Sequence, residues 1–266
     1  MRPGEVSARA AVSPLKRDAQ VAHKRVNMGL LAEPERRALR WLAERTPTRV
    51  MPDHMTALGV AGAVLVLIGL LGANISPLFV MLAIFGLFLN WLGDSLDGTL
   101  ARYRRIERPR FGYFMDHSCD LISQTFIFIG LGVSPYFTMF SALLALSMYL
   151  LMSSYTYLKV MVLGTHQLSY GGMGATELRV GIAAWSLFGI WFGPGLTGAE
   201  IVHHRVLDEA IGGMWLLVFV GFIWMVRSDL SKFHDIFARE EDGREFANDS
   251  NGIDAVRRAP AKPFSV

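Results

Sequence analysis

The sequence predicts an all-α membrane protein: a polytopic bundle of about six transmembrane helices, preceded by an amphipathic helix at the membrane surface. The chain has 266 residues, of which 52% are hydrophobic and 18% are charged, and its mean hydropathy is +0.34. This composition is too apolar for an ordinary soluble domain of this length and suits a small membrane protein. In addition, apolar runs of roughly 20 residues, the length that crosses a bilayer core, recur along the chain.

The first predicted element is an amphipathic helix over residues 33–46. Leu39, Trp41 and Leu42 can lie on the membrane while the arginines of the segment reach lipid headgroups, as in an interfacial helix. These arginines are Arg36, Arg37, Arg40 and Arg45. An ordinary charged surface helix is the alternative. Residues 1–32 lack strong periodicity, and we expect a mobile cytosolic segment there.

Six membrane spans are expected after this helix, with prolines and glycines marking the turns between them. They are placed at about 54–73, 77–102, 111–133, 136–163, 175–194 and 210–228. The predicted organisation is therefore a cytosolic N-terminal segment, a membrane domain and a cytosolic C-terminal tail, over residues 1–50, 51–228 and 229–266.

The distribution of Lys and Arg predicts the orientation of the spans. These residues crowd the N-terminal segment, the 103–110 turn and the residues after the last span, whereas the opposite loops carry few of them. Positive residues favour the cytoplasmic side. We therefore expect an integral protein of an inner or equivalent cell membrane, with both termini in the cytoplasm.

Four aspartates fall between residues 94 and 120, where two predicted spans meet the cytoplasmic side. A charge at a helix centre costs about 2.5–3.5 kcal/mol on insertion scales, so four of them point to a shared ligand. At about 100° per residue, Asp94 and Asp97 share one helix face, and Asp116 and Asp120 share a face of the next helix. Carboxylate oxygens suit Mg²⁺, Mn²⁺ or Ca²⁺.

Glycine and arginine stand beside these carboxylates. Gly98 and Gly112 lack side chains where the two faces would meet, so a bulky ligand can approach the backbone. Arg102 offers a fork of donors that matches phosphate oxygens. Together these residues predict a site for a diphosphate bound through a divalent cation, facing the cytoplasm.

This stretch resembles the signature of the CDP-alcohol phosphotransferase family, also called CDP-alcohol phosphatidyltransferases. The signature reads D-x-x-D-G-x-x-A-R, a spacer, and then G-x-x-x-D-x-x-x-D. All of its fixed positions are present, as Asp94, Asp97, Gly98, Ala101, Arg102, Gly112, Asp116 and Asp120.

The resemblance implies a metal-dependent transferase of phospholipid biosynthesis, acting as a homodimer with no nucleic-acid partner. It implies that Mg²⁺ or Mn²⁺, as two ions, is held by Asp94, Asp97, Asp116 and Asp120. Asp120 is also the expected general base, which takes the proton of an acceptor hydroxyl as CMP leaves the CDP-alcohol. The expected CDP-binding residues are Asp94, Asp97, Gly98, Ala101, Arg102 and Gly112. The alternative is that the carboxylates merely pair with arginines of the 103–110 turn.

Two residues before the first span are further candidates for CDP binding. The run Met51 to Thr56 resembles the family's P-N-x-x-T segment, with Asp53 in place of Asn. A carboxylate only accepts hydrogen bonds, so Asp53 could still contact the cytosine amino group, and Thr56 could assist. The alternative is that these residues simply cap a helix.

Four more residues are weaker site candidates. His117 and Glu177 resemble positions of the choline/ethanolamine phosphotransferase branch, although His117 could be packing alone. Arg179 could instead snorkel from the start of a helix. Lys159 and Arg179 are the cations that could serve an acceptor's phosphate. Since the 164–174 turn has no fixed charge, we expect a CDP-choline- or CDP-ethanolamine-like donor and a diacylglycerol-like acceptor.

Three other functions stay open on the sequence. One is a CDP-diacylglycerol-dependent phosphatidyltransferase acting on glycerol phosphate, inositol (phosphate) or serine. Another is a membrane prenyltransferase, whose motifs Asn90 and the paired D-x-x-D and D-x-x-x-D resemble, although the D-G-x-x-A-R element argues against it. The third is an ion transporter with a carboxylate relay, but no span has a broken-helix pattern.

Overall fold

The computed structural model describes residues 24–26, 32–163, 165–167, 175–193, 200–201 and 204–258. The described part is almost entirely helical, which confirms the all-α prediction. Its helices are α2 (Ala32–Arg45), α3 (Pro52–Gly72), α4 (Phe79–Arg104), α5 (Pro109–Val133), α6 (Met139–Leu163), α7 (Ala175–Phe192) and α8 (Val206–Arg258). Two short strand pairs complete it, β1 (Lys24–Val26) parallel to β2 (Thr165–Gln167), and β3 (Glu200–Ile201) antiparallel to β4 (His204–Arg205).

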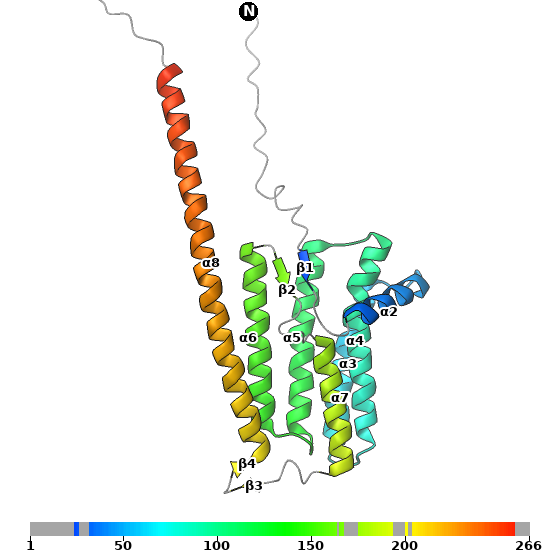
Figure 1. Cartoon of the computed structure of the whole chain (residues 1–266). Helices are drawn as coiled ribbons and strands as arrows, with labels where there is room; N and C mark the ends of the chain where they lie inside the picture. The colour runs from blue at the N-terminus through cyan, green and yellow to red at the C-terminus, as the bar shows by residue number, and fades with distance from the viewer. Residues whose placement is uncertain are drawn as a thin grey trace, which may run out of the picture. The chain divides into compact units, whose positions relative to one another are not determined.

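The chain divides into two compact units, Met1–Gly213 and Met214–Val266. In the first unit, α3 to α7 lie side by side, and α2 runs crosswise to α4 (Figure 1). Helix α3 contacts both α4 and α5. In the second unit, α8 continues as a single helix along which the rings of Trp215 and Phe219 stack. The site described below lies wholly in the first unit.

The predicted helices agree closely with the observed ones up to α7. Four helices are long and apolar enough to cross a membrane, namely α3, α4, most of α6 and the Val206–His234 part of α8. Helices α5 and α7 occupy the ranges predicted for the third and fifth spans, but charged residues interrupt their apolar character. The membrane bundle is therefore confirmed, and the count of six crossings stays a prediction.

Helix α8 extends well beyond the last predicted span. A span was expected over 210–228, followed by a cytosolic tail that begins as a helical extension, and the helix runs to Arg258. Asp229 and Lys232, one turn apart, form an ion pair with Nζ 3.8 Å from Oδ1, which supports the helix just after the predicted span. Most of the segment 1–32 that was expected to be mobile, most of the 164–174 turn and the last residues of the tail lie outside the described part of the chain.

Close packing of α3 on α4 depends on glycines that face each other across the contact. A Cβ on Gly62 would lie 2.4 Å from the backbone nitrogen of Asn90, and one on Gly93 would lie 2.3 Å from that of Gly59. Such contacts are far inside van der Waals distance, so only glycine permits this approach of the two backbones. The result is that the acidic end of α4 lies directly against the first turns of α3.

The chain reverses sharply between α4 and α5. Arg105 adopts a left-handed conformation with φ 58°, and the Ile106 N–H donates to the Ala101 carbonyl at 3.0 Å, as in a Schellman cap. Arg104 turns inward, and its guanidinium donates to the carbonyls of Thr46 at 2.9 Å and Pro47 at 2.8 Å. These contacts hold the α2–α3 linker beside the end of α4.

Replacing Gly93 by Ala should force α3 and α4 apart. We expect the free energy of unfolding to fall by about 1–3 kcal/mol, the usual cost of overfilling a packed contact, in chemical denaturation of the detergent-purified protein. Gly181→Ala on α7 is the matched control, since a Cβ there meets nothing within 4 Å. Equal stability of the two variants would contradict the close helix contact.

Candidate active site

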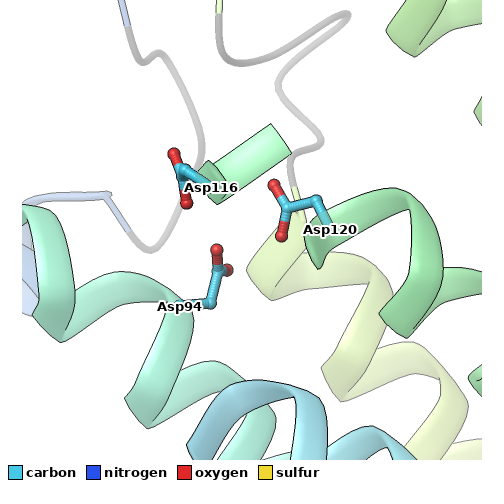
Figure 2. Close-up of side chains that lie close together, drawn as sticks. All are labelled: Asp94, Asp116 and Asp120. Atoms are coloured by element: carbon cyan, nitrogen blue, oxygen red, sulfur yellow. The ribbon is translucent and has the colours of Figure 1, made fainter. Parts of the chain in front are cut away.

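Three of the four predicted carboxylates converge. Asp94 comes from α4, Asp116 and Asp120 come from α5, and the three carboxyl groups point toward one another (Figure 2). One oxygen from each lies within 4.8 Å of the others. All three are half-buried. This is the convergence that the helical spacing predicts, and it places three hard oxygen donors around one point.

Asp97 lines the same small cavity, but its oxygens already have partners. Thr56 Oγ1 donates to Asp97 Oδ2 at 2.7 Å, and the Gly98 N–H donates to Asp97 Oδ1 at 2.5 Å. The carboxylate is only 7% exposed. Asp97 therefore belongs to the cavity wall between α3 and α4, and its role as a fourth metal ligand stays a prediction.

Arg179 is the buried cation of the site. Its Nη2 donates to Asp94 Oδ2 at 2.6 Å, and its Nε donates to Asn90 Oδ1 at 2.7 Å. The residue is 4% exposed, so it does not snorkel to the membrane surface. Asn90 in turn donates to the Gly59 carbonyl at 2.9 Å. One polar chain thus links α3, α4 and α7 and ends on a carboxylate of the site.

The remaining signature residues surround the end of α4. Arg102 folds back so that its guanidinium would lie 3.2 Å from a Cβ on Gly98, and it donates to Thr99 Oγ1 at 3.2 Å. Gly112 faces open space, because a Cβ added there would meet nothing within 4 Å. Ala101 is half-buried on the same turn as Arg102. A phosphate group has room to reach this backbone.

The other predicted site residues lie outside the cluster of Asp94, Asp116 and Asp120. Asp53 forms an ion pair with Arg108 and does not line the carboxylate cavity. His117 stacks on Tyr157, with ring centroids 4.7 Å apart, and its Nδ1 lies 3.7 Å from Asp116 Oδ2. Lys159 lies over the ring of Tyr155. Glu177 is half-buried in the first turn of α7.

Sequence reasoning missed the structural part played by Asn90. Its amide is 1% exposed, and it lies one helical turn before Asp94, inside an apolar run. That position could have predicted a polar contact near Asp94. A buried amide requires hydrogen-bond partners, and this one shares a helix face with a carboxylate. The partner, Arg179, lies far along the chain, so its contact with Asn90 could not be read from local spacing.

The donor set fits a divalent cation. Oxygen ligands from three carboxylates suit a hard ion such as Mg²⁺ or Mn²⁺, and like charges this close repel unless a cation neutralises them. Arg179 donates to Oδ2 of Asp94, and Asp94 also offers an oxygen within 4.8 Å of those of Asp116 and Asp120. The cluster can therefore hold a metal ion while the open backbone at Gly112 admits the ligand of that ion.

Arg179→Met should destabilise the protein strongly when measured in EDTA. Breaking a buried pair leaves Asp94 uncompensated, at a cost of about 3–5 kcal/mol in the free energy of unfolding. Asp94→Asn in the same chain should restore part of this loss.

Arg36→Met is the control for that experiment. The Arg36–Glu33 pair has the same N–O distance, 2.6 Å, but is exposed, so its loss should change stability by no more than about 1 kcal/mol. Equal effects of Arg36→Met and Arg179→Met on unfolding would show that burial of the Arg179 pair is not what matters.

Comparison with known proteins agrees with the site. A model of the CDP-alcohol phosphatidyltransferase family matches residues 49–225, more than half of the 266 residues. The chain is 29% identical to Cholinephosphotransferase 1 of Xenopus laevis over 173 residues, covering 60% of this chain and 41% of that protein. For Cholinephosphotransferase 1 of Danio rerio the identity is 26% over 204 residues, covering 72% and 50%.

The human Cholinephosphotransferase 1 is 24% identical over 184 residues, covering 65% of this chain and 44% of that protein. The chain thus spans half or less of the length of these relatives. The family match itself extends over both halves of the signature and over α3 to α7, the helices that build the carboxylate cluster. The chain belongs to the CDP-alcohol phosphatidyltransferase family.

Proposed function

We propose that the protein transfers a phospho-alcohol group from a CDP-alcohol to an acceptor alcohol, with release of CMP, in phospholipid biosynthesis. The observation that carries this proposal is the convergence of Asp94, Asp116 and Asp120 from the two halves of the family signature. Phosphoryl transfer needs mainly alignment and neutralisation of charge. Three carboxylates around a cation, beside glycine and arginine, supply both.

The roles of the residues follow from their positions. Asp94, Asp116 and Asp120 hold Mg²⁺ or Mn²⁺, and Asp97 joins them if a second ion binds. When bound, these ions neutralise the diphosphate and stabilise the charge that develops on it. Arg102 binds phosphate oxygens beside Gly98, and Gly112 and Ala101 leave space for the nucleotide. Asp53 and Thr56 lie at the start of α3, where the cytosine would bind.

Asp120 is the proposed general base. It lies deeper along α5 than Asp116, on the same face, and so it can meet an acceptor that enters from the membrane. It takes the proton of the acceptor hydroxyl as that oxygen bonds to the β-phosphorus of the donor. The bond between the β-phosphorus and the bridging oxygen then breaks, and CMP carries that oxygen away.

A choline- or ethanolamine-like donor and a diacylglycerol-like acceptor are the proposed substrates. The matched relatives bear the name cholinephosphotransferase, and His117 and Glu177 occupy the positions that resemble that branch. Lys159 lies over Tyr155 rather than among the carboxylates, which argues against a second phosphate on the acceptor. We further propose that the protein is a homodimer, with the site and both termini in the cytoplasm.

The direct test is turnover by purified protein in detergent or liposomes. Radiolabelled CDP-choline or CDP-ethanolamine with diacylglycerol should yield labelled phospholipid on chromatography. EDTA should abolish the product, and Mg²⁺ or Mn²⁺ should restore it. Turnover of CDP-diacylglycerol with inositol, serine or glycerol phosphate would instead assign the other branch of the family. Activity untouched by EDTA would remove the metal from the proposal.

Asp120→Asn should lower kcat by about 10²–10⁴-fold, the usual contribution of a general base. Binding of CDP, measured by calorimetry with Mn²⁺, should change much less, because the amide keeps the shape and one ligand oxygen. Ser118→Ala on the same helix turn is the control and should keep kcat within about twofold. An Asp120→Asn enzyme with the wild-type rate would show that another group takes the proton.

A further inference from the structure

Glu35 occupies an unexpected place in α2. It lies one turn before Leu39 and two turns before Ala43, which are buried against Leu96 and Leu100 of α4. The inward face of α2 is therefore apolar except for this carboxylate. Glu35 is half-buried, and removing a carboxylate from water is costly unless it is hydrogen-bonded, so its partners indicate what it does.

Those partners come from two different helices of the bundle. Glu35 Oε1 accepts from Trp91 Nε1 at 2.7 Å and from Ser95 Oγ at 3.0 Å, both on α4. It also accepts from Thr176 Oγ1, in the first turn of α7, at 3.0 Å, and Oε2 lies 3.2 Å from the same hydroxyl. One carboxylate thus joins α2, α4 and α7 through charge-assisted hydrogen bonds.

This junction lies next to the buried arginine. Thr176 precedes Arg179 by three residues, about one helical turn, and Trp91 and Ser95 each follow directly on a partner of Arg179, namely Asn90 and Asp94. Helices α4 and α7 are therefore connected at two successive levels. The first is direct, through Arg179, and the second runs through Glu35 of α2.

We propose that Glu35 is a positioning residue for the carboxylate cluster. By holding the first turn of α7 against α4, it keeps Arg179 on Asp94 and so keeps the carboxyl group of Asp94 turned toward Asp116 and Asp120. Its effect on turnover rests on the proposed function, whereas its effect on the geometry of the cluster does not. The surface helix α2 then helps to set the geometry of the site.

The test is Mn²⁺ affinity of the purified full-length protein, measured by electron paramagnetic resonance of the free ion. Glu35→Ala should raise the dissociation constant by about threefold to tenfold, somewhat less than the 10–100-fold that follows loss of a group bonded directly to a metal ligand. If Arg179 moves away from Asp94, the repulsion between Arg179 and the cation falls, which favours Mn²⁺ binding. We expect this gain to be smaller than the loss of affinity from a misoriented Asp94 carboxyl group.

Two variants of the same helix serve as controls. Glu44→Ala removes an exposed carboxylate whose cation, Arg45, lies 4.0 Å away, and it should leave Mn²⁺ affinity unchanged. Glu35→Gln keeps an acceptor oxygen for Trp91 and Ser95, and it should restore most of the affinity. A merely structural Glu35 would lower thermal stability without changing the affinity of the folded protein.

Thr176→Val completes a double-mutant cycle and removes a donor without touching α2. If Glu35 acts through Thr176, the double variant should weaken Mn²⁺ binding by a smaller factor than the product of the factors measured for Glu35→Ala and Thr176→Val alone. Should Glu35→Ala fail to fold, Thr176→Val alone should still weaken binding by about threefold. Unchanged or tighter Mn²⁺ binding in both single variants would overturn the proposal.

The same titrations separate this proposal from the proposed function. A protein that binds Mn²⁺ but turns over no CDP-alcohol would contradict the function, while the response of Mn²⁺ affinity to Glu35→Ala would still decide the role of Glu35. If turnover is found, kcat should fall in Glu35→Ala together with Mn²⁺ affinity, and Glu44→Ala should leave both unchanged.

Discussion

The structure depends on holding several carboxylates close together inside an apolar helix bundle. Each is partly removed from water, and each repels its neighbours, so the arrangement is unstable without compensation. Arg179 compensates Asp94, and Thr56 compensates Asp97. The proposed divalent cation would compensate the cluster of Asp94, Asp116 and Asp120. The same charge that makes the cluster costly would give it the affinity for a metal-bound diphosphate that the proposed function requires.

Backbone packing sets where these charges lie. Glycines at the α3–α4 contact bring the two backbones so close that a methyl group would not fit at Gly62 or Gly93. The acidic end of α4 is thereby fixed against α3, and α5 is fixed by its own contact with α3. Helix α2 then closes the arrangement through Glu35. The site is thus held by helix contacts rather than by loops, which suits a reaction that depends on alignment.

Local spacing predicted the features that repeat along one or two neighbouring helices. The convergence of Asp94, Asp116 and Asp120 follows from three- and four-residue intervals, and the helix ranges follow from apolar runs. Arg179, Glu35 and Arg104 were different, because their partners lie 54 to 141 residues away along the chain. The charged second half of α8 has no apolar periodicity, so the sequence indicated a helical extension after the last span without fixing its end.

The central claim is that carboxylates of α4 and α5 hold a cation that binds the diphosphate of a CDP-alcohol. Electron–nuclear double resonance on the Mn²⁺-loaded protein measures this directly, through the coupling between the ion and phosphorus. With CDP-choline bound, the wild-type protein should show a strong ³¹P coupling, which Asp116→Asn should weaken or abolish. Bound Mn²⁺ and bound nucleotide without any ³¹P coupling would contradict the account.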